Sequence, residues 1–234
     1  MRHLFFFILM LLSNLNQAQS KNDLVISRNN FKIESRLKAI QIDTLKSVYL
    51  RAFKMDRELE VWVSDGKIWK LFAVYPFCAN SGIPGRKRIQ GDRQIPEGCY
   101  KITEFNLWSN YHLSMRINYP NEADWFWADT SKPGGDIFIH GGCVTIGCIP
   151  ITDKYIEELW TMCKKTNEEI PVHIFSTRFD KQANLRKLYT FVYTKEDFLF
   201  QEEMKKVFFY FQKWRRIPDI KIDGKGKYVI LEKD

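Results

Sequence analysis

Segments rich in Val, Trp, Tyr and Phe, in which apolar and polar residues tend to alternate, follow one another through the middle of the chain. Such segments favour β-strands, because alternate side chains of a strand face opposite sides of a sheet. The Asp65-Gly66 pair between two of them is typical of a hairpin turn. The pattern predicts strands at 47–54, 58–65, 67–77, 99–105, 112–119, 136–140 and 171–175, and a short last strand at 226–232.

Helical spacing of apolar residues appears elsewhere, chiefly in the C-terminal part. In residues 152–165 the apolar residues fall on one helical face, and Thr152 is placed to cap the helix. Residues 195–216 form the clearest helical segment, and a weaker one covers 33–46. We therefore predict an α+β fold that is mainly β, with helices packed on the β core.

Two stretches between the predicted strands read as long loops, at 80–98 and 121–135. The first is dense in Gly, Pro and basic residues, and long exposed loops often carry function. At the level of the whole chain, the pattern predicts a signal peptide at 1–18, a helical lead-in or linker at 19–46, a catalytic domain at 47–178 and a helical extension packed on it at 179–234.

The first 18 residues have the organisation of a signal peptide. Arg2 supplies the positive start, residues 4–12 are apolar, and small and polar residues follow up to Ala18. The apolar run is short for a membrane span, which needs roughly 20 residues. We expect cleavage after Ala18, with Ser20 as another position, and export to the periplasm or cell envelope. An uncleaved membrane anchor is the alternative.

The chain is basic, with a formal net charge of +8. Residues 1–18 hold one Arg and no acidic residue, so removing them leaves 35 basic and 28 acidic residues, a net charge of +7. Excess positive charge favours an anionic partner. For an exported protein that is the cell wall, with its free carboxylates, or the membrane surface. The basic residues are scattered, which argues against nucleic acid, and the cluster at 213–216 is interpreted as a solvated helix end.

The chain holds five cysteines, and an odd number in an oxidising compartment leaves at least one thiol unpaired. Three of them, Cys78, Cys99 and Cys163, have apolar neighbours and are predicted to be buried thiols. Two disulfides stay open as alternatives, one between Cys78 and Cys99 and one between Cys143 and Cys148.

The densest set of reactive residues lies at 139–152, where His140, Cys143 and Cys148 are interleaved with glycines. A cysteine attacks as thiolate, and a neighbouring imidazole can take its proton. Cys148 is favoured as nucleophile because it follows Gly147, which lets nearby amides face an incoming carbonyl oxygen. A zinc site is the alternative, but no paired spacing supplies a fourth ligand. No metal and no cofactor are predicted.

The same segment resembles the signature of the L,D-transpeptidases, the YkuD-type peptidoglycan enzymes. The matching positions are His140-Gly141 and Thr145 to Cys148, and upstream Pro96 to Gly98 resembles the Pro-x-Gly strand entry of the family. Further blocks at 91–98, 118–124 and 171–175 resemble the YafK-like branch. The resemblance covers roughly 47–175 and implies a YkuD-type mixed β-sandwich or barrel core.

By this resemblance Cys148 is the acylated nucleophile and His140 its base. The Gly141 carbonyl would orient the imidazole, amides near Gly147 and Cys148 would form the oxyanion hole, and Thr145 belongs to the signature. The family attacks the carbonyl of the third stem-peptide residue at its L-centre and releases D-alanine. An amine then captures the acyl group. The resemblance thus implies peptidoglycan stem peptides as partners and a role in cell-wall biogenesis and cell shape.

Two departures from the family pattern bear on activity. Pro150 stands where many members have an Arg, and Ile146 stands where a His is common. Water could then replace the amine, giving a carboxypeptidase or an amidase that releases a wall-linked protein. A non-catalytic peptidoglycan-binding protein is a further alternative. The predicted substitutes for the missing cation are Arg93 first, then the other loop residues Arg86, Lys87 and Arg88, and last Arg116. His112 and His173 are interpreted as structural.

Overall fold

The computed structural model describes residues 2–231, and for residues 2–16 and Ala18 it describes the backbone alone. Met1 and residues 232–234 lie outside this range, so the ends of the predicted signal peptide and of the predicted last strand are not described. The helices are α1 (Arg2–Ala39), α2 (Glu122–Trp127), α3 (Thr152–Lys165), α4 (Gln182–Tyr189) and α5 (Lys195–Trp214). The strands are β1 (Ser47–Phe53), β2 (Glu58–Ser64), β3 (Trp69–Pro76), β4 (Gly98–Asn106), β5 (Ser114–Ile117), β6 (Phe138–His140), β7 (Ile149–Pro150), β8 (Pro171–Phe175), β9 (Asp219–Ile222) and β10 (Tyr228–Leu231).

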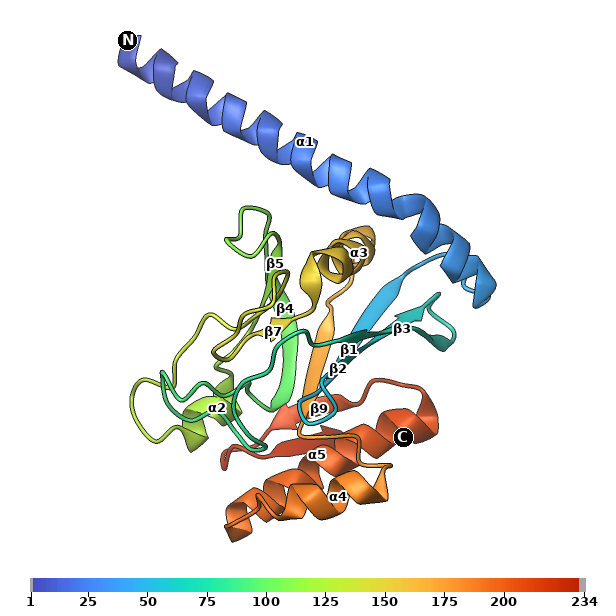
Figure 1. Ribbon diagram of the computed structural model, residues 1–234, viewed down its shortest axis with the longest axis vertical. Coiled ribbons are helices and arrows are strands. Elements are labelled where there is room, and N and C mark those ends of the chain that lie inside the picture. The colour runs from blue at the N-terminus through green and yellow to red at the C-terminus, as the bar shows by residue number, and fades with distance from the viewer. Residues whose placement is uncertain (1, 232–234) are drawn as a thin grey trace.

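The first eight strands form one curled mixed sheet in the order β3-β2-β1-β8-β4-β5-β6-β7 (Figure 1). β1 pairs with β8 and β6 pairs with β7 in parallel, and the other neighbours are antiparallel. β9 and β10 form a separate hairpin. The predicted α+β, mainly β fold of the YkuD type is confirmed.

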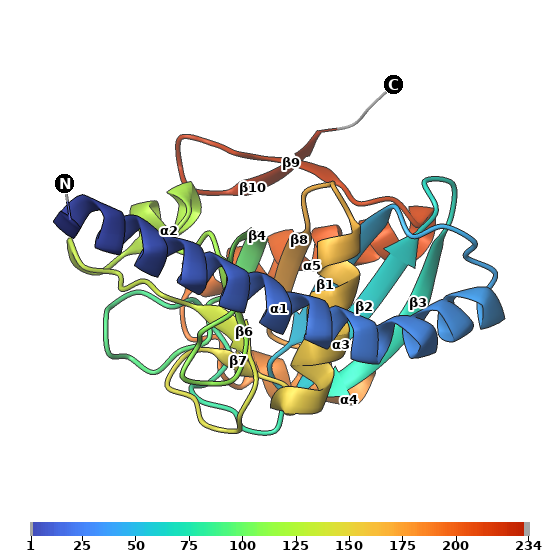
Figure 2. The same cartoon turned by 90° about the horizontal axis from the view of Figure 1, so that it is seen from above.

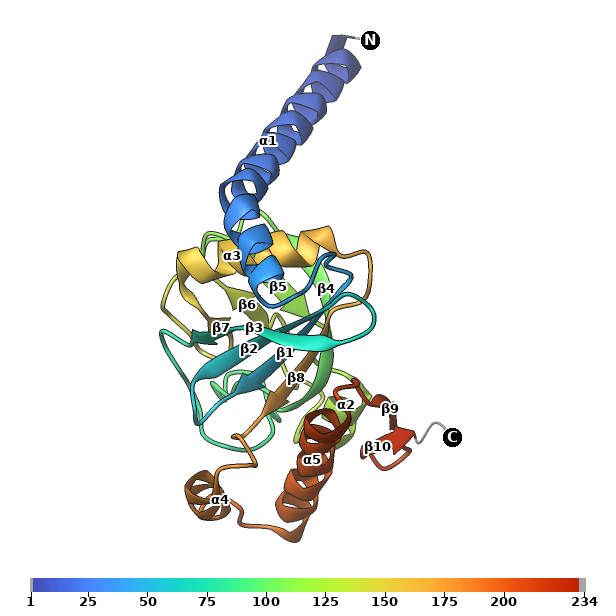
Figure 3. The same cartoon turned by 90° about the vertical axis from the view of Figure 1, so that its right-hand side faces the viewer.

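Helices cover both faces of the sheet (Figure 3). Leu159 and Trp160 of α3 are buried in the larger core with the side chains of β1, β2 and β8. On the other side, Phe200 and Phe208 of α5 pack with Phe53 and other apolar residues in a second core. The apolar stripes of α3 and α5 therefore hold the sheet between two layers, as expected for amphipathic helices.

Three local features differ from the sequence-based prediction. α2 lies inside the predicted loop 121–135, where the Asn121 side chain accepts from the amides of Ala123 and Asp124 in a capping box. The prediction that Thr152 caps α3 is wrong: the N-cap is Ile151, which makes no side-chain cap bond. Thr152 is the first helical residue and has a φ of 70°, because the chain turns sharply there between β7 and α3. β7 and β9 were not predicted, since strands of two and four residues carry little pattern.

α1 is one continuous helix that spans the predicted signal peptide and most of the predicted lead-in, and it crosses over α3 (Figure 2). Val25, Ile33 and Leu37 are buried in the larger core. Arg36 and Lys32 both form ion pairs with Glu158 of α3, which is 1% exposed. The second half of α1 is thus packed as part of the domain rather than as a free linker. Within residues 2–231, no helix combines the length and hydropathy that a bilayer span requires.

The packing of α1 predicts a contrast between two of its apolar residues. Ile33 is fully buried whereas Phe31 is 84% exposed. Ile33→Ala should lower the free energy of unfolding by about 2–4 kcal/mol, because it removes methylene groups and leaves a cavity. The matched control Phe31→Ala should leave it unchanged within about 0.5 kcal/mol. Urea denaturation followed by tryptophan fluorescence measures both, and equal values would mean that α1 is not docked in solution.

Candidate active site

The pairing of β6 with β7 places His140 and Cys148 on the same side of the sheet. Ile139 is opposite Ile149 and His140 is opposite Pro150 in a parallel register. Side chains alternate between the two faces of a strand, so Cys148, one residue before Ile149, belongs to the face of His140. The Cys148 thiol donates to the Asp136 carbonyl at 3.7 Å. The register therefore puts Cys148 level with Phe138, two residues before His140, with both side chains on one face of the sheet.

His140 is 1% exposed, and its ring is held in one orientation. Nδ1 is hydrogen-bonded to the Gly141 carbonyl, which can only accept, so Nδ1 carries the proton and Nε2 is left as the basic nitrogen. The Tyr111 ring lies against the imidazole with centroids 4.6 Å apart. Burial lowers the pKa of His140, and the contact with Gly141 opposes this. The ring is therefore neutral near pH 7 and suited to accept a proton.

Cys148 is half-buried, and its surroundings keep the resting thiol protonated. Burial raises its pKa, the Phe138 backbone N–H lowers it, Asp136 raises it and the Lys87 ammonium lowers it. With the thiol protonated and the imidazole neutral at rest, attack by Cys148 would require proton transfer during the reaction rather than a preformed ion pair.

The loop between His140 and Cys148 is held by hydrogen bonds to its own residues and to its neighbours. The Thr145 hydroxyl donates to the Cys148 carbonyl at 2.7 Å and accepts from the Gly147 amide at 3.1 Å. Gly142 N donates to Asp153 at 2.8 Å. A Cβ at Gly141 would lie 2.5 Å from an Asp153 oxygen, so no side chain fits there. Because Thr145 occupies the Gly147 amide, the Cys148 amide is the better placed of the two predicted oxyanion donors.

A disulfide joins Cys78 to Cys143, with Cα atoms 5.2 Å apart. The pairing corrects the prediction that Cys78 is a buried thiol, and it replaces both alternatives, Cys78 with Cys99 and Cys143 with Cys148. Tertiary contacts bring the two cysteines together. Cys78 follows β3, and its amide donates to the Pro150 carbonyl at 3.0 Å, which sets Cys78 beside the loop between His140 and Cys148, called the catalytic loop below. Cys99, Cys148 and Cys163 are free.

Comparison with known proteins identifies the family. Residues 38–174 match the family model described as the YkuD L,D-transpeptidase catalytic domain. The chain belongs to the L,D-transpeptidase family. It is 30% identical over 189 residues to YafK of Escherichia coli (strain K12), a protein whose name assigns it provisionally to the L,D-transpeptidases; the match covers 78% of this chain and 73% of YafK.

Solved structures with a related fold include the helical cell shape determining protein Pgp2 from Campylobacter jejuni. It is 20% identical, with a TM-score of 0.48, and the match covers 81% of this chain and 80% of Pgp2. Bd1075 from Bdellovibrio bacteriovorus is 19% identical, with a TM-score of 0.42 and coverage of 81% and 78%.

In this member of the L,D-transpeptidase family, the loop between β3 and β4 forms a wall beside Cys148. The Asp92 carboxylate organises this loop by accepting hydrogen bonds from the backbone amides of Arg88, Ile89 and Gln94. It also accepts from the Lys87 ammonium, with the nitrogen and oxygen 2.5 Å apart. A Cβ at Gly147 would lie 3.0 Å from the Gln94 carbonyl oxygen, so this loop touches the turn that carries Cys148.

Lys87 connects that wall to the segment on the other side of the thiol. It is 5% exposed, and its Cε would lie 3.2 Å from a Cβ at Gly134. Residues 134–136 lead to the Asp136 carbonyl that accepts from Cys148. A buried cation therefore lies between the two segments that flank Cys148.

The four predicted substrate-binding arginines occupy different surroundings. Arg86 stacks on Phe200 at 3.8 Å and on Trp127 at 4.5 Å, and burial lowers its pKa to about 10, so it packs the loop against α5 and is not free to bind a carboxylate. Arg88 pairs with Asp129 and Asp197. Arg93 is exposed in the loop beside Gln94.

Arg116 is better placed than the sequence suggested. It is opposite Phe138 in the β5–β6 pair, and therefore faces the same side as His140 and Cys148. Its guanidinium lies 3.2 Å from the side chain of Asp136, which is largely exposed.

Sequence reasoning missed Tyr111 and Asp153 as site residues, and it interpreted Lys87 as a carboxylate-binding residue of the loop, not as a buried neighbour of Cys148. No local pattern marks them, because each reaches the catalytic loop from a different element. The histidines interpreted as structural have protein partners: His112 pairs with Glu157 at 2.7 Å and buried His173 with the Tyr49 hydroxyl at 2.7 Å. Among the described residues, no group of three or more His, Cys, Asp and Glu side chains is arranged to hold a metal ion.

The disulfide predicts a redox-dependent stability. It closes a segment with a sequence separation of 65 residues, so dithiothreitol should lower the free energy of unfolding by about 2–4 kcal/mol. A Cys78→Ser/Cys143→Ser variant should show no effect of reductant. Urea denaturation with and without dithiothreitol measures this, and an equal response of both proteins would contradict the pairing.

The surroundings of Cys148 predict selective alkylation. Cys163 is buried and Cys99 is partly buried, and burial raises the pKa of both thiols strongly, so iodoacetamide should modify Cys148 much faster than either in the native protein. Lys87→Met should move the pH midpoint of this reaction upward by about half a unit to one unit, because it removes a nearby positive charge.

The control for this change is the exposed neighbour Lys132, since Lys132→Met makes the same substitution outside the site. Circular dichroism verifies that both variants are folded, and mass spectrometry of the alkylated peptide gives the rates. An unshifted midpoint in folded Lys87→Met would show that Lys87 only holds the loop together.

Proposed function

We propose that this protein is an exported acyl-transfer enzyme that acts on peptidoglycan stem peptides through a thioester at Cys148. The observation that carries the proposal is the β6–β7 register, which sets Cys148 on the face of a neutral, oriented His140. Membership of the L,D-transpeptidase family supports it and supplies the substrate class.

In the first step, His140 Nε2 takes the proton of the Cys148 thiol while the sulfur attacks the carbonyl carbon of the third stem residue at its L-centre. The carbonyl oxygen becomes negative and is stabilised by the Cys148 amide. The bond to the D-alanine nitrogen then breaks, and the imidazolium returns its proton to that nitrogen. D-Alanine leaves as a free amino acid, and the thioester remains.

In the second step, a nucleophile attacks the thioester carbonyl and regenerates the thiol. His140 takes a proton from the incoming amine or water, and the sulfur leaves and is reprotonated. An amine gives a cross-linked or exchanged peptide, and water gives a shortened stem. Both outcomes use the same residues, because the chemistry differs only in the acceptor.

The cation that many family members carry two residues after the nucleophile is replaced here by Pro150, so another residue must meet the stem-peptide carboxylates. Arg116 is our first candidate because it shares the face of Cys148 and pairs with exposed carboxylates that a substrate can displace. Arg93 is the second candidate. Arg86 is withdrawn because its guanidinium is packed between two aromatic rings.

Hydrolysis is the second candidate function, and the exposed apolar residues of the catalytic loop favour it. Val144 is 57% exposed and Ile146 is 77% exposed, immediately before the nucleophile. A small charged amine gains nothing from these side chains, whereas an apolar protein surface would bury them. Release of a wall-linked protein by water would use the same thioester.

The proposed place of action is the periplasm, reached by the signal peptide predicted at 1–18. The net positive charge of the chain suits the carboxylate-rich wall, and the disulfide between Cys78 and Cys143 suits an oxidising compartment.

Incubation with tetrapeptide muropeptides tests the proposal. Intact-protein mass spectrometry should show an adduct of the tripeptide acyl group, with loss of D-alanine. Cys148→Ala should abolish the adduct, and Cys163→Ala, which removes a buried free thiol distant in sequence from the site, should retain it. No adduct with tetra- or pentapeptide stems would contradict enzymatic function and favour a wall-binding protein.

Product analysis with and without an added amine distinguishes the two acceptors. A transferase should incorporate the amine into the product, and a hydrolase should give the same shortened stem in both reactions. Intact sacculi carrying a linked protein provide the third substrate, since release of that protein into solution identifies the amidase.

A further inference from the structure

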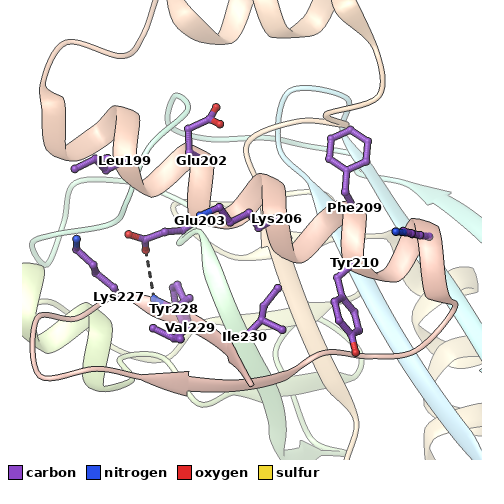
Figure 4. Close-up of a pocket in the computed structure, with 11 residues that line it drawn as sticks. Leu199, Glu202, Glu203, Lys206, Phe209, Tyr210, Lys227, Tyr228, Val229 and Ile230 are labelled. Atoms are coloured by element: carbon purple, nitrogen blue, oxygen red, sulfur yellow. Dashed lines mark hydrogen bonds between the residues drawn. The ribbon is translucent and has the colours of Figure 1, made fainter. Parts of the chain in front are cut away.

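An apolar groove of about 720 Å³ runs between α5 and β10, and none of the candidate active-site residues lines it (Figure 4). α5 forms one side and β10 the other, and a hydrogen bond from Tyr228 N to Glu203, 3.3 Å long, crosses between them. Leu199, Phe209 and Val229 line the groove and are 38–42% exposed. Apolar side chains gathered in a groove and left in water favour a binding surface.

The strand along the groove has one unpaired edge. β10 pairs with β9 alone in the described part of the chain. Asp223 N donates to the Lys227 carbonyl at 3.0 Å, so residues 223 and 227 form a hydrogen-bonded pair of the antiparallel ladder. Such pairs recur at every second residue, so Lys221 and Val229 form the next one. The backbone groups of Tyr228 and Ile230 therefore point away from β9. Glu203 accepts from the Tyr228 amide, which confirms this direction and leaves the Ile230 N–H and C=O facing outward.

The charges around the groove are unbalanced. Among residues 2–231, the structure shows no ion pair for Lys206, Lys213 or Lys227, all of which line the groove. The two acids beside them are already engaged. Glu202 accepts from Lys205 and from the Tyr189 hydroxyl, and Glu203 accepts from Tyr228. The charge of Lys227 acts on Glu203 and Asp223, so Lys206 and Lys213 are the groove cations left to meet an anionic ligand.

We propose that the groove binds an extended, acidic segment of a partner protein, which adds as a strand to the edge of β10. Main-chain bonds to Ile230 would give affinity, apolar side chains would fill the groove, and carboxylates between them would meet the lysines. From Leu199 to Lys213, α5 rises about 21 Å. That length matches about six residues of extended chain.

The free backbone edge of β10 favours a protein segment as the ligand. A strand added to β10 must present a regular L-peptide ladder, which a stem peptide with D-residues does not. The inference is independent of the proposed function, because it concerns the C-terminal layer and not the thiol.

Two fluorescent heptapeptides test the proposal on the full chain. Both carry Val, Phe and Val at alternate positions, with Glu at the other positions in one and Lys in the other. By fluorescence anisotropy, the acidic peptide should bind at least tenfold more tightly than the basic one. Equal affinity, or no binding of the acidic peptide, would overturn the proposal.

Charge variants locate the site. Lys206→Glu/Lys213→Glu should lower the affinity for the acidic peptide at least tenfold and raise the affinity for the basic peptide. The control Lys195→Glu/Lys225→Glu makes the same change of charge at positions that do not line the groove, and it should bind as the original chain does. Equal loss in both variants would mean that only overall charge attracts the peptide.

A backbone variant tests the strand pairing. Ile230→Pro removes an N–H that points away from β9, so the hairpin should persist, as judged by circular dichroism, while peptide affinity falls at least fivefold. Unchanged affinity in the folded variant would overturn strand addition. Binding to vesicles that contain one-third phosphatidylglycerol is measured last. If the chain binds these vesicles more tightly than the acidic peptide, and this binding depends on Lys206 and Lys213, the groove binds a membrane surface and the proposal is overturned.

Discussion

The two-residue parallel pairing of β6 with β7 is the constraint on which the active site depends. Without it, His140 and Cys148 would be joined only by a glycine-containing loop with many accessible conformations. The pairing is short, and it is held from outside: Ile151 N donates to the His140 carbonyl, and Cys78 N donates to the Pro150 carbonyl. The bond from Cys78 to Cys143 then ties the loop to the end of β3. Contacts distant in sequence therefore replace the stability that two residues of strand cannot supply.

The same arrangement sets the electrostatics of the site. Burial keeps both partners neutral at rest, because it raises the pKa of Cys148 and lowers that of His140. The Lys87 ammonium opposes the first effect, and Asp92 holds Lys87 in place. A thiol that ionises only when a base takes its proton is protected from unspecific oxidation. The loop beside the nucleophile thus provides charge as well as shape.

The C-terminal layer supports that loop. Glu97, at the loop's end, accepts from Gly85 N, from Lys54 and from Gln201 of α5. Arg86 packs on Phe200 of the same helix. These contacts connect α5 to the wall of the active site through buried groups that are costly to separate. Occupation of the groove on the far side of α5 would therefore act on a helix that also supports the catalytic loop.

Much of the site was accessible from the order of residues alone. The His140 to Cys148 segment carries its chemistry in its residue types, and the family signature and the alternating apolar pattern gave the fold class, because both are local properties of the chain. The predicted strands had five or more residues, and β7 and β9, with two and four residues, were missed because they carry too few residues for a period.

Only the tertiary structure decided the rest. The partner of Cys143 is 65 residues away, and Tyr111 and Asp153 each approach the site from a separate element, so no spacing along the chain indicates them. The sequence ranked Arg93 first among the basic candidates, and packing separated buried Arg86 from Arg116, which shares the face of His140. Residue order determines which chemical groups are available and which local structure they favour. Which groups meet is decided by the folding of distant segments onto a shared sheet, where burial and hydrogen bonding select a single arrangement.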